Sequence, residues 1–185
     1  MDAGLDSLET ARLKLRRFTV DDLPLLQRLN SDAEVMRYLG GVETAEQTYE
    51  ALHGRIISYY DERPGYGVWA TLERDSDTCI GFHLLNDIRG SEHIQIGYRL
   101  LPEYWGRGYA TEMSVALMRY GYTQLKLSQL TAITHLDNTG SQQVLLKAGL
   151  HRKDERVFDH PAYRAFSPLA WFERDAADWV AQFGA

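Results

Sequence analysis

The chain has a single cysteine in 185 residues, no long apolar run and no excess of basic residues. One cysteine excludes an internal disulfide and is typical of a reducing compartment, so we predict a cytoplasmic protein. No stretch approaches the ~18 consecutive apolar residues that a membrane-spanning helix needs. The acidic start, residues 1–6, lacks the basic and apolar regions of a signal peptide. We therefore expect no association with a membrane.

The net charge of −6 argues against a general nucleic-acid-binding surface, which needs clustered lysine and arginine. The six histidines show no spacing typical of metal ligands, so no metal site is predicted. Cys79 lies in a predicted strand, where it is interpreted as a small buried apolar residue rather than a thiol nucleophile. With 44% hydrophobic residues and no linker or repeat, residues 1–185 are expected to form one domain.

Residue patterns predict strands alternating with helices. Turn residues at 75–77 join two of the strands into a hairpin. One helix has clear ends, with Thr139 and Gln142 interpreted as a capping box and Gly149 as the residue that ends it. The expected strands are residues 12–16, 66–72, 79–85, 94–101, 130–134, 151–158 and 163–171. The expected helices are residues 21–30, 43–60, 109–124, 139–148 and 172–183.

The most informative segment is YWGRGYATE, residues 104–112, which connects the strand at 94–101 to the longest predicted helix. The first turn of a helix has unpaired N–H groups and the positive end of the helix dipole, so it attracts anions. Gly106 and Gly108 remove the side chains that would keep a phosphate from the backbone. The segment therefore predicts a site for a phosphorylated cofactor, with a simple tight turn as the alternative.

Dinucleotide-binding proteins use a related loop, G-x-G-x-x-G, which turns directly out of a strand into its helix. Only Gly106 and Gly108 meet this pattern, because Thr111 stands at the third glycine position. Residues 101–105 also separate the loop from its strand. The sequence therefore disfavours a dinucleotide site.

The segment resembles the acyl-CoA pyrophosphate loop of the GNAT N-acetyltransferase superfamily, whose pattern is [QR]-x-x-G-x-[GA]. Gly108 and Ala110 match, while Trp105 stands where Gln or Arg is usual. That departure is typical of the branch that contains the ribosomal-protein N-terminal acetyltransferases. The same branch is resembled by LETARLKLR at residues 8–16, by NTGS at residues 138–141 and by KAGL at residues 147–150. The resemblance spans about residues 8–175.

The resemblance implies an α/β (α+β) GNAT fold: a mixed, largely antiparallel seven-stranded sheet flanked by helices, with a central parallel pair that splays apart. The fourth and fifth strands form this pair, and the pantetheine arm of acetyl-CoA lies in their gap like an extra strand. Gly97 is interpreted as a bulge or a close backbone approach, with an ordinary weak strand position as the alternative. The implied cofactor-binding residues are Leu100, Leu101, Gly106, Arg107, Gly108, Tyr109, Ala110, Thr111, Asn138 and Ser141.

In this family the amine attacks the thioester directly, so a base must first remove a proton from the amine. The sequence departs from the family twice, with Gln95 where a basic Glu is frequent and Leu145 where a tyrosine acid is frequent. The role of acid passes to Ser141, as suggested for this branch, or to water. The base stays open among Glu92, His93, His135, Asp159, His160 and water.

The predicted function is therefore acetyl-CoA-dependent N-acetylation of a primary amine, on a protein N-terminus or on a small molecule. No metal is expected, and the protein is expected to act as a monomer or a homodimer. The two departures from the family pattern keep a catalytically weak acyl-CoA-binding or sensing module as the alternative. The sequence does not identify the amine.

Overall fold

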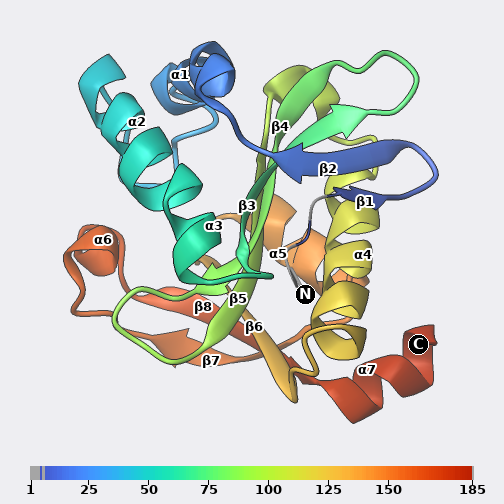
Figure 1. Cartoon of the computed structure of the whole chain (residues 1–185). Coiled ribbons are helices and arrows are strands. Elements are labelled where there is room, and N and C mark those ends of the chain that lie inside the picture. The colour runs from blue at the N-terminus through green and yellow to red at the C-terminus, as the bar shows by residue number, and fades with distance from the viewer. Residues whose placement is uncertain (1–4, 6, 185) are drawn as a thin grey trace.

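The computed structural model describes residue 5 and residues 7–184, and all of its strands join one sheet (Figure 1). The remainder of the acidic start, residues 1–4 and 6, lies outside the described residues. The strand order is β1-β2-β3-β4-β5-β6-β8-β7. The strands are β1 (Ser7–Glu9), β2 (Leu13–Arg17), β3 (Gly67–Glu73), β4 (Cys79–Asp87), β5 (Ile94–Leu100), β6 (Gln129–His135), β7 (His151–Arg156) and β8 (Leu169–Asp175).

Helices cover both faces of the sheet (Figure 1). One face carries α1 (Leu23–Ser31), α2 (Ala45–Ala51), the π-helical segment η2 (Leu52–Ile57) and α3 (Tyr59–Glu62). The opposite face carries α4 (Tyr109–Thr123) and α5 (Thr139–Lys147), which contact each other. The remaining helical segments are the 3-10 turns η1 (Val20–Asp22) and η3 (Pro102–Tyr104), the short α6 (Pro161–Arg164) and the terminal α7 (Ala176–Phe183).

The sheet opens at its centre, between β5 and β6. These strands are the parallel pair, and they share one in-register position, Gln95 with Thr131. The Thr131 hydroxyl also donates to the Ile94 carbonyl at 2.8 Å. By contrast, β4 and β5 pair continuously from Gly81–Leu100 to Asp87–Ile94. The mixed sheet with a splayed parallel pair, expected from the GNAT resemblance, is confirmed.

The sheet has eight strands rather than the seven expected, because β1 pairs with β2. This strand is short and half exposed, so it has no apolar pattern to reveal it. The bulge interpretation of Gly97 is wrong, since the ladder around it is regular. A Cβ atom there would lie 3.2 Å from a side-chain carbon of Leu84, so Gly97 marks a close side-chain contact and not a backbone approach. The register irregularities lie between Thr71 and Leu72 in β3 and between Arg152 and Asp154 in β7.

Three predicted element bounds need correction. The helix expected at 43–60 is interrupted by the π turn of η2. The strand expected at 163–171 begins only at Leu169, because Pro168 has no N–H to donate to the ladder. The terminal helix begins at Ala176 rather than at residue 172, because residues 172–175 remain paired with β6.

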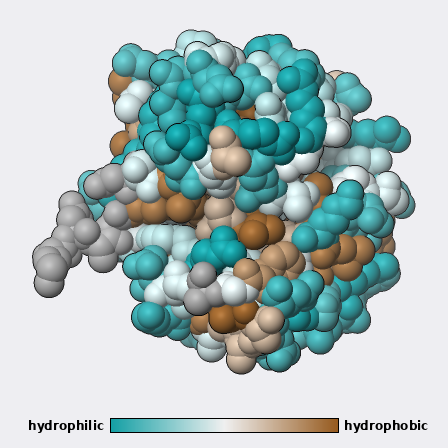
Figure 2. Space-filling view, turned by 90° about the vertical axis from the view of Figure 1, so that its right-hand side faces the viewer, coloured by the Kyte–Doolittle hydropathy of each residue, from teal (hydrophilic) through white to brown (hydrophobic). Residues whose placement is uncertain are grey.

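Figure 2 shows the side of the molecule that carries α4 and α7. Its upper half is mainly hydrophilic, and hydrophobic residues gather in its lower half. In Figure 1, α4 runs from an upper end beside β2 to a lower end that leads into β6. The start of α4 therefore lies in the hydrophilic part of this face. Among the described residues, no helix has the length and apolar character needed to cross a membrane.

Candidate functional site

The glycine loop lies between η3 and α4, and its residues 105–108 are exposed. Gly106 and Gly108 have φ angles of 72° and 79°, in the left-handed region that favours glycine. Gly108 is the N-cap residue of α4, and no side chain caps this helix start. The N–H groups of the first turn, from Tyr109 to Thr111, therefore lack the capping side chain that closes many helix starts. A loop of this shape fits a pyrophosphate, because backbone donors and the helix dipole point toward the anion.

Trp105 explains how this loop is fixed without the usual Gln or Arg. Its indole N–H donates to the Leu100 carbonyl at 2.8 Å, which ties the loop to the end of β5. The guanidinium of Arg107 lies over the Tyr104 ring, 5.2 Å from its centroid. Arg107 is exposed, so its side chain can reach a bound phosphate or solvent.

Glu112, in the first turn of α4, joins the glycine loop to the N-terminal motif at residues 8–16. Its carboxylate accepts hydrogen bonds from the Thr10 hydroxyl at 2.7 Å and from the Arg12 backbone N–H at 3.0 Å. The Arg12 guanidinium donates to the same carboxylate at 2.7 Å and to the Arg107 carbonyl at 3.0 Å. Residues 10–12 thus brace the loop, a contact between distant segments that the sequence pattern did not predict.

The exposed backbone edge of β5 lies beside the gap. The Leu101 N–H donates to the Ile80 carbonyl at 2.9 Å, and its carbonyl accepts from Tyr104 at 3.0 Å. Since hydrogen-bonded pairs alternate along antiparallel strands, the backbone groups of Tyr98 and Leu100 turn away from β4 toward the gap. The Leu100 carbonyl already accepts from the Trp105 indole, and both backbone groups of Leu101 are hydrogen-bonded, so the geometry favours the Leu100 N–H over Leu101 as a contact for a ligand in the gap.

At the start of α5, Asn138 is the N-cap residue, and its side-chain oxygen accepts from the Ser141 N–H at 3.1 Å. The predicted capping box of Thr139 and Gln142 is wrong, because Gln142 donates instead to the Leu136 carbonyl at 2.7 Å. Asn138 reaches this N–H from just outside the helix, which is the position that helix caps prefer. The predicted helix end is confirmed, with Gly149 at a φ of 96°.

Ser141 faces Tyr98 of β5 across this end of the gap. The two hydroxyl groups interact, and this contact opposes the effect of burial, which raises the pKa of Tyr98. Leu145, at the position where relatives carry a tyrosine acid, is buried in the core at 1% exposure. No sequence motif indicated that the Tyr98 hydroxyl is a neighbour of Ser141.

Beneath Tyr98 lies His83 of β4, which the sequence also did not single out. The two rings are 5.7 Å apart, and His83 Nδ1 forms a hydrogen bond with the Thr71 hydroxyl at 2.7 Å. Burial lowers the pKa of His83 to about 3, with the Ala110 carbonyl acting in the opposite direction. His83 is therefore neutral near pH 7 and supports Tyr98 by packing.

The five residues considered as the general base do not form one cluster. His135 accepts the Asp137 N–H and packs on Tyr38, with ring centroids 5.2 Å apart. His93 lies against Trp171, with ring centroids 4.8 Å apart. Two others serve local structure, since His160 caps α6 and Asp159 pairs with Arg164 at 3.1 Å. Glu92 differs, because it lines a cavity.

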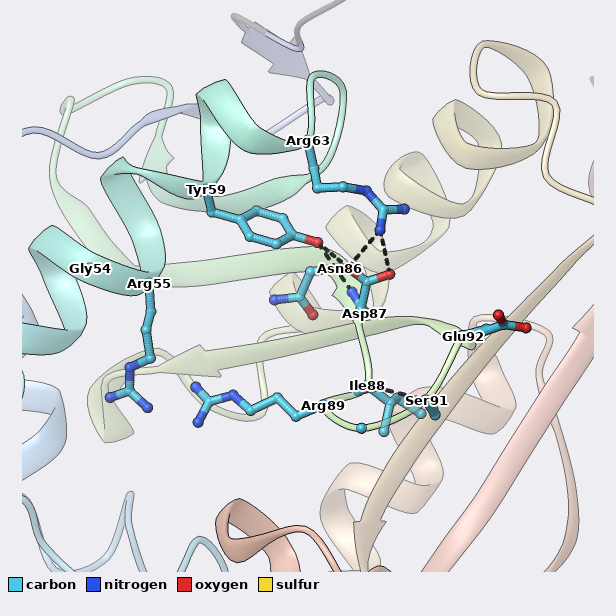
Figure 3. Close-up of a pocket in the computed structure, with 11 residues that line it drawn as sticks. Gly54, Arg55, Tyr59, Arg63, Asn86, Asp87, Ile88, Arg89, Ser91 and Glu92 are labelled. Carbon is cyan, nitrogen blue, oxygen red and sulfur yellow. Dashed lines mark hydrogen bonds and ion pairs between the residues drawn. The ribbon is translucent and has the colours of Figure 1, made fainter.

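This cavity, of about 590 Å³, lies between the β4–β5 hairpin and the η2–α3 segment (Figure 3). On one side Asp87 is held by the Tyr59 hydroxyl at 2.6 Å and by Arg63 at 3.0 Å. Burial, and then the Asp87 contact, raise the pKa of Tyr59 to about 12. The lining residues are Gly54, Arg55, Tyr59, Arg63, Asn86, Asp87, Ile88, Arg89, Gly90, Ser91 and Glu92.

The cavity is joined to the centre of the sheet through Asn86, whose side-chain oxygen accepts from Gln95 at 3.3 Å. Gln95 is the residue at which β5 and β6 meet. The sheet thus has a cofactor-shaped loop on the α4 side and a polar cavity on the other. No group of three or more His, Cys, Asp or Glu side chains that could hold a metal is found among the residues described.

Comparison with known proteins decides the family. The model of the acetyltransferase (GNAT) domain matches residues 12–151. The chain belongs to the GNAT acetyltransferase family. It is 34% identical over 151 residues to the uncharacterized N-acetyltransferase YoaA of Bacillus subtilis, covering 79% of this chain and 83% of YoaA. It is 29% identical over 155 residues to the spermidine N(1)-acetyltransferase of Escherichia coli K12, covering 80% and 77% of the two chains.

Solved structures agree on the fold of this acetyltransferase. An acetyltransferase from Agrobacterium tumefaciens superposes with a TM-score of 0.80 at 21% identity, covering 92% of this chain and 95% of the other. The spermidine N-acetyltransferase of Vibrio cholerae, in complex with CoA and spermine, superposes with a TM-score of 0.73 at 16% identity. Coverage there is 92% of this chain and 99% of the other.

Proposed function

We propose that this acetyltransferase transfers the acetyl group of acetyl-CoA to a primary amine, on a protein N-terminus or on a small molecule. The observation that supports this proposal most is the uncapped start of α4 behind Gly106 and Gly108, beside the opening between β5 and β6. The donors for the pyrophosphate are the backbone amides of residues 106–110, the Thr111 hydroxyl and Arg107. The backbone N–H of Leu100, with Asn138, is proposed to contact the pantetheine arm, whereas the backbone groups of Leu101 already pair with Ile80 and Tyr104.

Acetyl-CoA supplies the thioester carbonyl that the amine attacks. Backbone N–H groups of β5 that point into the gap can polarise this carbonyl, as oxyanion-hole donors do. Ser141 is proposed to donate the proton that the departing thiolate needs, and the Tyr98 hydroxyl beside it can replace that proton. For the base, Glu92 is favoured because it lines the cavity, while His93, His135, Asp159, His160 and water remain candidates.

The three sequence motifs support placement in the ribosomal-protein N-terminal acetyltransferase-like branch. A Vibrio cholerae structure provisionally named a ribosomal-protein-serine acetyltransferase has a TM-score of 0.72 with this chain at 19% identity. The spermidine acetyltransferases among the relatives favour a small-molecule amine instead. A cytoplasmic setting and a monomeric or homodimeric state remain predictions.

Ligand-dependent melting tests the cofactor. Acetyl-CoA at 100 times its Kd should stabilise the fold by about 2.7 kcal/mol, which is about 5–10 °C for a chain of this size. NAD and ATP at equal concentration should do much less, because they lack the pantetheine arm that fits the gap. Equal shifts with NAD would contradict the proposal.

A catalytically weak acyl-CoA-binding or sensing module is the second candidate. Gln95 and Leu145 favour it, since they stand where many relatives carry a base and an acid. A free-thiol assay with a broad panel of amines separates the two candidates. Binding of acetyl-CoA without release of CoA across the panel would support the sensor, and amine-dependent release would support the enzyme.

A further inference from the structure

Two exposed arginines of the cavity, Arg55 and Arg89, face each other. Arg55 comes from the π turn of η2 and Arg89 from the β4–β5 hairpin, and Figure 3 shows their guanidinium groups pointing toward one another. Among the described residues, neither side chain forms an ion pair or a hydrogen bond with a carboxylate. The charge of Arg55 disfavours that of Arg89, so this pair is stabilised when an anion lies between the two groups.

The other charges of the cavity are differently placed. The Asp87 carboxylate is occupied by Arg63, with both oxygens 3.0 Å from the guanidinium. In Figure 3, Glu92 lies on the far side of the cavity from Arg55. Arg55 and Arg89 thus form a positive end of the cavity, apart from its acidic rim at Asp87 and Glu92, and the charge of Glu43 offsets only part of it.

A third arginine extends this positive end toward the sheet. Arg99 of β5 is partly buried, and its guanidinium donates to the side-chain oxygen of Asn30 in α1. Asn30 in turn donates to Glu43 at 2.8 Å. The negative charge of Glu43 also acts on Arg89 and Arg99, although among the described residues it forms no ion pair with either of them. Burial, and then the charge of Arg55, lower the pKa of Arg89, and burial lowers that of Arg99 to about 10. Both groups remain charged near pH 7.

We propose that Arg55 and Arg89 bind an acidic group, a carboxylate or a phosphate, on the amine that this enzyme acetylates. The inference rests on the proposed function, because it assigns the cavity to the amine substrate. The reacting amine then occupies the acidic rim or the sheet side of the cavity, while its acidic group occupies the positive end. A polyamine is disfavoured, because each extra ammonium group adds repulsion at Arg55 and Arg89.

Isothermal titration with matched amines tests the proposal, both with and without CoA. The probes are γ-aminobutyrate, its neutral amide γ-aminobutyramide, the diamine putrescine and, for the phosphate arm, aminopropyl phosphate. At least one acidic amine should bind about tenfold or more tightly than putrescine and the amide, the ratio expected for one charge-assisted hydrogen bond. The two acidic probes distinguish carboxylate from phosphate recognition.

Substitutions test whether Arg55 and Arg89 cause the preference for an acidic amine. Arg55→Gln and Arg89→Gln should each remove most of the preference for the acidic amine. Arg152→Gln, an equal change of charge on the exposed strand β7, should leave it intact. Tighter or equal binding of putrescine, an unchanged preference in both cavity variants, or no binding of either acidic probe would overturn the proposal.

Release of CoA in the same samples distinguishes failure of the proposed acetyltransferase function from failure of the proposed anion site at Arg55 and Arg89. If the acidic amine binds through Arg55 and Arg89 but no amine releases CoA, the anion site stands and the acetyltransferase function of this chain fails. If putrescine releases CoA faster than the acidic amines do, the function stands and the anion site is wrong.

Discussion

The candidate sites on the two sides of the sheet differ in composition, because one is formed by backbone groups and the other by side chains. On the α4 side, the candidate cofactor site consists mainly of backbone: two glycines at positive φ, an uncapped helix start and a strand edge. On the opposite side, the cavity consists of side chains from η2, α3 and the β4–β5 hairpin. The first site is continuous in sequence over residues 100–111, whereas the second combines segments about thirty residues apart.

This difference affects how each side of the sheet responds to substitution. A backbone site depends on few residue types, because every residue except proline supplies an N–H group. A side-chain site can be rebuilt by changing single residues, such as Arg55 and Arg89, without altering the fold. Substitutions on the two sides should therefore have different signatures, one on acetyl-CoA binding and the other on the amine.

The largest expected effect is that of Gly108→Glu. The new side chain enters the phosphate space with a like charge, so acetyl-CoA affinity should fall by about 100-fold or more. The positive φ adds a modest loss of stability, of about 1–2 kcal/mol, but the loop is exposed and the fold should persist. Titration calorimetry and thermal melting measure the two effects.

Gly41→Glu is the matched control, because Gly41 has a φ of 98° and a Cβ there would meet nothing within 4 Å. This variant should bind acetyl-CoA normally. A Gly108→Glu protein that folds and binds with unchanged affinity would show that the loop is only a turn.

Ser141→Ala tests the proton donor next to the gap. If the hydroxyl acts mainly in the transition state, kcat should fall by roughly 10²-fold or more, with little change in acetyl-CoA binding. Tyr98→Phe removes only the neighbouring hydroxyl, so it should lower kcat less. A fall of less than about threefold for Ser141→Ala, far below the general-acid expectation, removes Ser141 from the mechanism.

Glu112→Gln tests the hydrogen bonds by which Thr10 and Arg12 brace the start of α4. Burial alone would raise the pKa of Glu112, but hydrogen bonds from Thr10 and Arg12 bring it below its usual value of 4.5. The unfolded chain therefore binds this proton more readily. The stabilisation is complete above about pH 5 and is lost as the pH falls through the lowered pKa.

The variant should lose about 1–3 kcal/mol of unfolding free energy at pH 7, the range for hydrogen bonds to a charged group. Near pH 3 the difference in unfolding free energy between the variant and the native protein should shrink. Urea denaturation of both proteins at pH 7 and pH 3 measures this difference. An equal difference at the two pH values would mean that the ionised carboxylate does not stabilise the brace.

The smallest effect is expected for Cys79→Ala. Burial raises the pKa of the Cys79 thiol to about 11, so the thiol is protonated near pH 7. The kcat should stay within about twofold of the native value, because a protonated thiol is a poor nucleophile. The native thiol should react slowly with alkylating reagents, which also keeps the free-thiol assay specific for CoA. A large loss of kcat would restore a thiol mechanism.

The sequence by itself determined the glycine loop, the helix that follows it and most of the strands. Each of these depends on local rules: glycine for positive φ, an unpaired helix start after the loop, and apolar alternation for a strand. The helix end at Gly149 also follows from such a rule, whereas the family and the splayed parallel pair followed from the resemblance of the motifs. Where local signals were weak, as in β1, or overridden, as in the π turn of η2, the prediction failed.

Only the tertiary structure decided which distant residues meet. Nothing in the sequence joins Thr10 and Arg12 to Glu112, or the Ser141 hydroxyl to Tyr98, because these contacts depend on how helices pack on the sheet. The same holds for the facing guanidinium groups in the cavity. The sequence gives their charge, but only the packing of η2 against the β4–β5 hairpin brings the two groups face to face.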